Sequence, residues 1–395
     1  MQDNEKKPAL RFKDFTDPWE QRKFSDITFP AGEKNRDNLP LESYSITNEH
    51  GFIPQDEKFE NGGTMREADK RMYYIVFPNS FAYNPARINV GSIGYQNTGK
   101  DVIVSSLYEV FKTSDDVDDR LLWHWFKSPD FQKLIFQLQE GGVRLYFYYD
   151  KLCMGTVSLP SLEEQRKIGQ FFDSLDTLIT LHQRKYEKLV NIKKSMLDKM
   201  FPQNGASVPE IRFKGFTDPW EQRKISELAE KTYGGGTPTT SNEAFWNGNI
   251  PWIQSSDIVD GKLMGVEPRK YITQTGLNSS ATQLVPKDSI AIITRVGVGK
   301  LAYMPFSYST SQDFLSLSKL NTEPFFTVYA CYKKLQSELN TVQGTSIKGI
   351  TKDELLAKTI SVPVYSEQKQ IGSFFTQLDT LITLHQREHI KPILE

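Results

Sequence analysis

The sequence has few of the residues on which several classes of protein depend. It contains only 2 cysteines, Cys153 and Cys331, and 5 histidines in 395 residues. Two distant cysteines make neither a disulfide framework nor a zinc site, so we expect a reduced, cytoplasmic environment. No apolar run approaches the roughly 20 residues of a membrane span, and the N-terminus lacks the pattern of a signal peptide. We therefore expect no association with a membrane.

An excess of charge of either sign is also missing. The 48 Lys and Arg residues are balanced by 49 Asp and Glu residues, which leaves a formal net charge of −1. Any surface that binds nucleic acid must therefore be local. The apolar fraction of 38% and the charged fraction of 25% are those of a globular protein. The length predicts two or three domains.

Motifs that would indicate an enzyme are absent. The sequence has no dinucleotide-binding fingerprint, no G-x-S-x-G, no H-E-x-x-H and no Asn/Asp-Pro-Pro-aromatic tetrad of an adenine methyltransferase. Gly94–Asp101 (GYQNTGKD) has the spacing of a phosphate-binding loop, but Asp101 stands where Ser or Thr would bind magnesium. A β-turn is the favoured interpretation of that segment. We expect no catalytic residue, no metal site and no cofactor in this chain.

What the sequence does contain is a duplication. The sequence FTDPWEQRK at Phe15–Lys23 occurs again at Phe216–Lys224. The match extends backwards to include RFK, and the only difference is that Asp14 in the first copy is replaced by Gly215 in the second. Asp-Pro initiates a turn, and the tryptophan that follows predicts a contact with an apolar edge. We expect each copy to join a globular domain to a helical scaffold.

A second, longer repeat predicts that scaffold. EEQRKIGQFFDSLDTLITLHQR (Glu163–Arg184) returns as SEQKQIGSFFTQLDTLITLHQR (Ser366–Arg387), with 16 of 22 positions identical. Apolar residues recur at alternating steps of four and three, which is typical of a coiled coil. We expect the two helices to pack antiparallel within the chain and to hold two domains apart. His182 and His385, at equivalent positions, would form a polar pair that sets the register, while Pro392 interrupts the second helix.

These repeats predict a mixed α/β (α+β) protein with a pseudo-twofold tandem duplication. Two homologous globular domains at 1–160 and 203–364 are each followed by a helix, at 161–202 and, in shortened form, at 365–395. Within the first domain the pattern over 118–139 predicts a helix. Ten residues of the repeats are expected to dock the domains or partner chains: Trp19, Arg22, Trp220, Arg223, Phe172, Leu175, Ile179, Phe375, Leu378 and Ile382.

The regions between the repeats differ, and their polar loops are candidates for recognition. Asn, Gln and Arg can bind base edges, and Ser, Thr and Lys contact phosphates. Taken singly, each of these residues is also compatible with an ordinary solvated loop. The candidates are Asn97, Lys100, Arg144, Tyr146 and Tyr148 in the first region, and Thr237, Gln254, Ser255, Ser256, Arg295, Lys300, Thr345, Ser346 and Lys348 in the second.

The chain as a whole resembles the specificity subunits of type I restriction-modification systems. The paired FTDPWEQRK segments, the two LDTLITLHQR helices, GGGTPTTSNEAFWNGNIPWIQSSDI, TRVGVGK and GTSIKGITKDEL carry the resemblance. It implies two target-recognition domains that each read one half of a bipartite, asymmetric site in double-stranded DNA. It also implies that the helices set the gap between half-sites and dock two methyltransferase subunits.

In such a complex the chemistry belongs to the partners. The resemblance implies that S-adenosylmethionine is bound by the methyltransferase subunits, and ATP and Mg²⁺ by restriction and translocase subunits. Two alternatives stay open. One is a tandem binding module for another polymer, such as a glycan; the other is a nucleotide-dependent enzyme that uses Gly94–Asp101.

Overall fold

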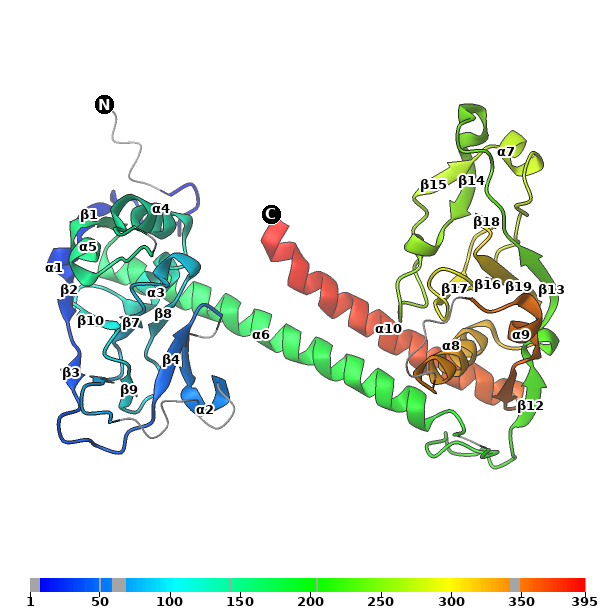
Figure 1. Ribbon diagram of the computed structural model, residues 1–395, viewed down its shortest axis with the longest axis horizontal. Helices are drawn as coiled ribbons and strands as arrows, with labels where there is room; N and C mark the ends of the chain where they lie inside the picture. Colours follow the sequence, from blue (N-terminus) through cyan, green and yellow to red (C-terminus); the bar gives the residue numbers. More distant parts are fainter. Residues whose placement is uncertain are drawn as a thin grey trace. The chain divides into compact units, whose positions relative to one another are not determined.

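Two structural units divide the chain, which the computed structural model describes at residues 8–49, 51–58, 69–142, 144–203, 205–341 and 349–394. The units are Met1–Ile179 and Thr180–Glu395 (Figure 1). Helix α6 (Leu162–Lys199) starts in the first unit and ends in the second. Within the described ranges, no helix is long and apolar enough to cross a membrane.

A four-stranded antiparallel sheet forms the centre of the first unit. Its strands lie in the order β2 (Thr28–Pro30), β10 (Glu109–Thr113), β7 (Phe81–Tyr83) and β8 (Ile93–Tyr95). Its apolar side chains pack in an aromatic core with Phe126, Phe131 and Phe147. Further strands form a β3-β6-β9 sheet and a β4-β5 hairpin, at Glu33–Lys34, Tyr74–Val76, Val102–Val104, Tyr44–Thr47 and Gly51–Pro54.

The helix predicted over 118–139 is two helices in the structure, α3 (Asp119–Trp125) and α4 (Pro129–Leu138). The first helix ends at its C-cap Phe126, and Ser128 caps the start of the second, because its hydroxyl accepts a hydrogen bond from the Phe131 amide at 3.4 Å. Pro129 then takes the first helical position, where no amide hydrogen is needed. The shorter helices are α1 (Phe24–Ile27), α2 (Gln55–Lys58), η3 (Ile88–Val90) and α5 (Tyr149–Met154).

The second unit repeats the sheet of the first. Its strands lie in the order β13 (Ala229–Gly234), β19 (Phe314–Leu320), β16 (Ser289–Ile293) and β17 (Leu301–Met304), and all three pairings are antiparallel. A three-stranded sheet, β15-β14-β18, adds Lys270–Ile272, Trp246–Ile253 and Ser309–Thr310. The helices are η4 (Ile225–Glu227), η5 (Glu243–Phe245), η6 (Ser255–Asp257), α7 (Gln274–Asn278), α8 (Pro324–Thr341) and α9 (Lys352–Ala357).

The duplicated EQRK letters form the same short strand twice. In the first unit β1 (Glu20–Lys23) pairs antiparallel with β11 (Thr156–Leu159), the strand that leads into α6. In the second unit β12 (Glu221–Lys224) pairs with β20 (Thr359–Val362), the strand that leads into helix α10 (Tyr365–Leu394). The register is the same in both, with each Arg facing an apolar residue: Arg22 opposite Val157 and Arg223 opposite Ile360.

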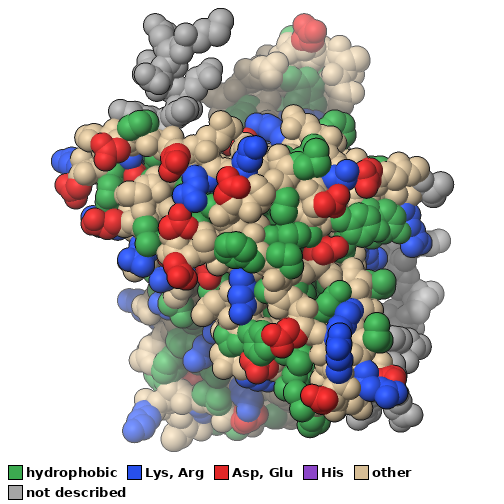
Figure 2. Space-filling model, turned by 90° about the vertical axis from the view of Figure 1, so that its left-hand side faces the viewer, with side chains coloured by type: hydrophobic (Ala, Val, Ile, Leu, Met, Phe, Trp, Pro, Cys, Tyr) green, Lys and Arg blue, Asp and Glu red, His purple; other side chains and the backbone are tan. Residues whose placement is uncertain are grey.

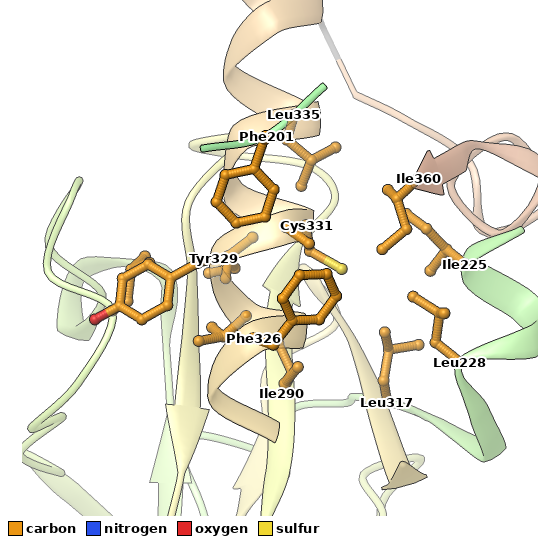
Figure 3. Close-up of a cluster of buried hydrophobic side chains, with 14 of the residues drawn as sticks. Phe201, Ile225, Leu228, Ile290, Leu317, Phe326, Tyr329, Cys331, Leu335 and Ile360 are labelled. Atoms are coloured by element: carbon orange, nitrogen blue, oxygen red, sulfur yellow. The ribbon is translucent and has the colours of Figure 1, made fainter. Parts of the chain in front are cut away.

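Within the second unit, the end of α6 packs antiparallel against α10. His182 and His385 meet with their Nδ1 atoms 3.2 Å apart, and further along Lys193 Nζ lies 2.5 Å from an oxygen of Asp379. The side chains of Leu197, Met200 and Phe201 then enter the main core of this unit, where Figure 3 shows Phe201 beside Phe326 and Tyr329 of α8. The predicted antiparallel coiled coil is therefore formed here.

The fold class predicted from the sequence, two homologous mixed α/β units with long helices, is confirmed by this repetition of sheet order and register. The expectation that Pro392 interrupts the second helix is wrong, because α10 extends to Leu394. A proline this close to a helix end removes little of the hydrogen-bond ladder.

Candidate nucleic-acid interface

Several loops of the second unit meet at one segment, Ser309–Asp313, which comprises β18 and the three residues after it. The residues that contact the segment lie at or just after the ends of strands β13, β14 and β16. Main-chain hydrogen bonds of 2.7–2.9 Å fix them there: Gly236 to Thr310, Ser311 to Ile253 and Thr294 to Asp313. Loops from distant parts of the sequence thus form one surface.

The glycine-rich loop after β13 can approach this segment only because it lacks side chains. A Cβ atom on Gly235 would lie 1.8 Å from the carbonyl oxygen of Ser311, and one on Gly236 would lie 2.5 Å from the amide nitrogen of Thr282. The next residue, Thr237, is exposed, and its hydroxyl donates a hydrogen bond to Gln312 Oε1 at 2.6 Å. Gln312 is exposed too, and the sequence did not single it out.

Gln254 follows β14 as the N-cap of the short 3-10 turn η6, which contains Ser255 and Ser256. The turn is held by Asp257, whose buried carboxylate accepts a hydrogen bond of 3.0 Å from the Gln254 amide. Asp257 Oδ1 has no hydrogen-bond partner in the described part of the chain, although Arg269 Nε lies 3.6 Å away. The Ser256 side chain is exposed, while Gln254 and Ser255 are half-buried.

Arg295 and Lys300 lie at the two ends of the turn that joins β16 to β17. Gly297 and Gly299 both have φ of +93°, a left-handed conformation that glycine adopts without strain. The Ile293 amide donates to the Lys300 carbonyl at 2.9 Å, which closes the turn. Arg295 is exposed and Lys300 half-buried, so a guanidinium and an ammonium group come from one turn.

Three of the predicted contact residues, Thr345, Ser346 and Lys348, lie outside the described residues. The chain is described again from Gly349, and the Ile350 amide donates to the Thr294 carbonyl at 2.7 Å. This hydrogen bond holds Ile350 beside the residue that precedes Arg295.

A buried hydroxyl network supports the segment from below. Tyr308, just before β18, is fully buried and donates to Ser316 Oγ at 3.0 Å while it accepts from Ser289 Oγ at 3.1 Å. Burial raises the pKa of Tyr308 to about 12, so its phenol is neutral at any physiological pH. This network ties β18 to two strands of the main sheet.

In the first unit, Asn97 and Lys100 lie in the turn between β8 and β9. The fully buried Gln96 organises it, with its side-chain oxygen accepting from the Thr98 amide and its amide group donating to the Lys100 carbonyl, both at 2.7 Å. Lys100 pairs with Glu42, and this hydrogen bond raises the pKa of the lysine. No helix follows the turn, so Gly94–Asp101 does not form a phosphate-binding loop.

Arg144, Tyr146 and Tyr148 lie near the end of β7, whereas the turn with Asn97 adjoins its start. The Phe147 amide, between the tyrosines, donates to the Pro85 carbonyl just beyond β7. The rings of Tyr146 and Tyr148 stack with centroids 5.6 Å apart and planes 1° from parallel, and Tyr148 is 42% exposed. Since Asn97 adjoins the start of β7 and Tyr148 its end, the structure does not bring the five candidates of this unit into one cluster.

The residues predicted to dock the domains or partner chains lie either in the buried core or at partly exposed positions. Trp220 is 4% exposed in the main core, whereas Trp19 is half-buried. Arg22 Nη1 lies 2.9 Å from Asp116, and hydrogen bonds from Ser114 and then Arg22 lower the pKa of that carboxyl. Arg223 lies 2.8 Å from Glu221 on the surface.

The six helix positions of that group also differ between the copies. Phe375 and Leu378 of α10 are 0% and 8% exposed. Their equivalents on α6 are less covered, with Phe172 41% exposed and Leu175 half-buried. Ile179 and Ile382 are half-buried.

The sequence reasoning missed the contact that closes each unit. Arg11 makes two hydrogen bonds of 2.7 Å to Glu164, and Arg212 makes two of 2.8 Å to Glu367. Both carboxylates are fully buried, and the hydrogen bond to Glu367 raises the pKa of Arg212. The signal was present, because each pair is repeated within the two duplicated segments. No group of three or more potential metal ligands occurs in the described ranges.

Comparison with models of protein families shows which family the chain belongs to. The model described as "Type I restriction modification DNA specificity domain" matches residues 19–191 and 217–393, which together cover most of the chain. The chain belongs to this family. Each match contains one copy of the EQRK strand, one four-stranded sheet and most of one long helix. The family domain is thus the unit that is duplicated.

Named members of the type I specificity family align with part of the chain. The EcoR124I/EcoR124II specificity subunit of Escherichia coli is 30% identical over 169 residues, 41% of each chain. The MjaIX specificity subunit of Methanocaldococcus jannaschii is 27% identical over 177 residues, 43% of this chain and 40% of that one. These alignments span about two fifths of the relatives' length.

Solved structures share the fold over nearly the full length. A type I restriction-modification S subunit from M. genitalium has a TM-score of 0.58 at 13% identity, and covers 97% of this chain and 95% of its own. A chain from a study of complex assembly in the type I R-M system has a TM-score of 0.51 at 17% identity, with 95% and 93% covered. At these identities the likeness shows the fold alone.

Proposed function

We propose that this chain is the DNA-reading subunit of a type I restriction-modification complex. One observation carries the proposal: the two units have the same strand order, the same pairing of the EQRK strand and the same buried Arg–Glu pair, but unlike loops. A repeated scaffold with different loops suits two domains that read different DNA sequences. Family membership and the names of the relatives, which are specificity subunits, support this assignment.

Each unit would read one half of a bipartite, asymmetric site in double-stranded DNA. In the second unit, the surface around Ser309–Asp313 offers an Arg, a Gln and several hydroxyl groups, which are the groups that bind base edges and phosphates. In the first unit, Asn97 and Lys100 would contact DNA separately from Arg144 and the stacked tyrosines. Long helices α6 and α10 would set the number of unread base pairs between half-sites.

The chemistry would be supplied by partners. The repeated scaffold offers two similar surfaces to two copies of a methyltransferase subunit, as expected for a pseudo-twofold chain. In this assignment the methyltransferase subunits bind S-adenosylmethionine, and restriction and translocase subunits use ATP and Mg²⁺. In this proposal the chain itself recognises the DNA sequence and contributes no catalytic group. It would act in the cytoplasm.

Tight DNA binding should require those partners. The formal net charge is −1, and on the face shown in Figure 2 basic and acidic side chains are interspersed rather than gathered in one basic stripe. Because phosphate neutralisation supplies most non-specific affinity, the isolated chain should bind a duplex weakly. Nanomolar specific binding by the isolated chain at physiological salt would contradict this part of the proposal.

The experiment that tests the whole assignment is methylation mapping by long-read sequencing. A host would express this chain with its methyltransferase partner, and single-unit loop variants would be mapped beside it. One bipartite motif with a fixed gap, in which first-unit and second-unit variants alter different halves, is the expected result. No new methylated motif, with the chain folded and the partner bound, would leave another polymer as the ligand; a glycan array would then be the next measurement.

A further inference from the structure

Gln312 carries an exposed amide side chain between two residues whose backbone is fixed. On one side Ser311 is buried, and its amide donates to the Ile253 carbonyl at 2.9 Å. On the other side the Asp313 carbonyl accepts hydrogen bonds from the amide of Thr294 at 2.7 Å and from its hydroxyl at 3.0 Å. The backbone therefore fixes the position from which this amide group extends into solvent.

The amide group of Gln312 is itself oriented by Thr237. The Thr237 hydroxyl donates to Gln312 Oε1 at 2.6 Å. Gly236, just before Thr237, is held at both of its backbone groups, because its carbonyl accepts from Trp252 Nε1 at 3.0 Å and its amide donates to the Thr310 carbonyl at 2.8 Å. A long side chain that is already held loses less conformational freedom on binding, so Gln312 is preorganised.

The remaining hydrogen-bonding capacity of Gln312 limits what it can bind. A carboxamide has two lone pairs on its oxygen and two N–H donors on its nitrogen. In the described part of the chain, the Gln312 amide makes one hydrogen bond, in which Thr237 occupies one of the lone pairs. One acceptor position and both donors are left, so the amide can donate one hydrogen bond and accept another from the same ligand.

Adenine is the base whose major-groove edge has the complementary pattern. Its N7 acceptor lies beside its N6 amino donor, and a glutamine binds both groups at once. Guanine offers two acceptors, thymine offers one acceptor and cytosine offers one donor, so each of these bases leaves part of the amide without a partner. The free groups of Gln312 therefore match an A·T pair.

The corresponding turn of the first unit has different side chains. By sheet order, β10 of the first unit is equivalent to β19, and the turn before β10 is Ser105–Tyr108, which contains no amide side chain. In the second unit Gln254 also belongs to the candidate surface, but it is only half-buried rather than exposed. A base contact by Gln312 would thus belong to one of the two half-sites.

We propose that Gln312 determines specificity for one adenine in the half-site bound by the second unit, an inference that rests on the proposed function. Its amide would donate to N7 and accept from the N6 amino group in the major groove. Thr237 is a positioning residue, because its hydroxyl holds the amide oxygen and leaves the donor and the second lone pair for the base.

The test uses the complex of this chain with its methyltransferase partner, after the motif of the parent chain has been mapped. Duplexes in which each base pair of the second unit's half-site is replaced in turn compete for binding. Gln312→Ala should lose about tenfold or more of the discrimination at one A·T pair and none elsewhere. Gln312→Glu keeps an acceptor and removes the donor, so it should favour cytosine over adenine at that position.

Two substitutions at Thr237 test the positioning. Thr237→Val removes the hydroxyl and should relax the same base position, whereas Thr237→Ser keeps the hydroxyl and should retain the discrimination. Gln222→Ala is the matched control and should leave the motif unchanged. Gln222 is exposed and its amide donates to Ser361 Oγ at 2.7 Å, but it lies on β12, away from β18 (Figure 1).

A parent complex whose bipartite motif is unchanged by Gln312→Ala would overturn this inference and leave the proposed function intact. An equal loss of affinity for every duplex would also overturn it, because Gln312 would then contact a phosphate. A loss of discrimination confined to a G·C pair would overturn the assignment to adenine. A parent complex without any motif would overturn the proposed function, and this inference with it.

Discussion

Arg212 holds Glu367 through two hydrogen bonds of 2.8 Å, and these residues are 155 positions apart in the sequence. The carboxylate is fully buried and the guanidinium 13% exposed. Arg212→Ala would leave a buried charge without its partner, so we expect the second unit to lose about 3 to 5 kcal/mol of stability. Urea unfolding followed by tryptophan fluorescence measures this loss.

Arg223→Ala is the control for that change. It removes the same side chain from a surface pair with Glu221, in which both side chains are at least 40% exposed. Such pairs contribute about 0 to 1 kcal/mol. Equal losses for Arg212→Ala and Arg223→Ala would contradict the special role of the buried pair.

Gly372 of α10 should not tolerate even a methyl group. A Cβ atom there would lie 2.5 Å from Glu323 Oε2 and 2.8 Å from the Phe326 amide nitrogen, at the start of α8. Alanine gains about 1 kcal/mol in helix propensity, but overpacking costs about 1 to 3 kcal/mol. We expect Gly372→Ala to raise neither the urea midpoint nor the melting temperature, and to lower both.

The same outcome is expected for Gly169→Ala in the first unit, where a Cβ atom would lie 2.6 Å from Asp118 Oδ1. Ser373→Ala is the control, since Ser373 is exposed on the same helix. Stabilisation by either glycine substitution would show that helix packing at this contact is looser than the distances indicate.

Arg295→Ala should weaken DNA binding by the assembled complex at the half-site read by the second unit. If Arg295 contacts a base, the complex should lose about 1 to 3 kcal/mol of discrimination at one base position of the motif. If Arg295 contacts a phosphate, binding should weaken equally for all sequences, and the slope of log K against log salt concentration should fall by about 1. Lys287→Ala is the matched control, because Lys287 precedes β16 and Arg295 follows it. An equal loss for both would mean that only general charge matters.

Tyr308 should make the stability of the second unit depend on pH in alkali. Its pKa is about 12 in the folded chain against about 10 when exposed, so folding favours the neutral phenol. The contribution is complete below pH 10 and is lost as the pH rises to about 12, by at most about 2 to 3 kcal/mol. Urea midpoints measured from pH 9 to 11 should therefore fall less steeply for Tyr308→Phe.

At neutral pH the same substitution should cost about 1 kcal/mol, because Ser289 and Ser316 each lose a hydrogen-bond partner. Tyr271→Phe is the comparison, since it removes the same hydroxyl group from a side chain that is 39% exposed. Identical slopes for Tyr308→Phe and the parent chain would contradict this prediction.

The duplication, the long helices and the family were readable from the sequence, because repeats and heptad spacing are local patterns. The EQRK letters predicted a docking element without revealing that it is a strand paired with residues 156–159 or 359–362. Strand pairing over more than a hundred residues leaves no local signal, since it depends on which chain segments the sheet brings together.

By itself, the sequence determined that the chain has two similar domains and two similar helices, because segments with the same amino-acid sequence adopt the same local structure. Only the tertiary structure decided that the candidate loops of the second unit gather at Ser309–Asp313, while those of the first unit lie at the two ends of β7. Only it showed that Phe375 is buried and its duplicate Phe172 exposed. Equivalent phenylalanines differ in burial because burial depends on the side chains that pack against them. The residues that cover Phe375, among them Phe201, lie outside the repeated segments.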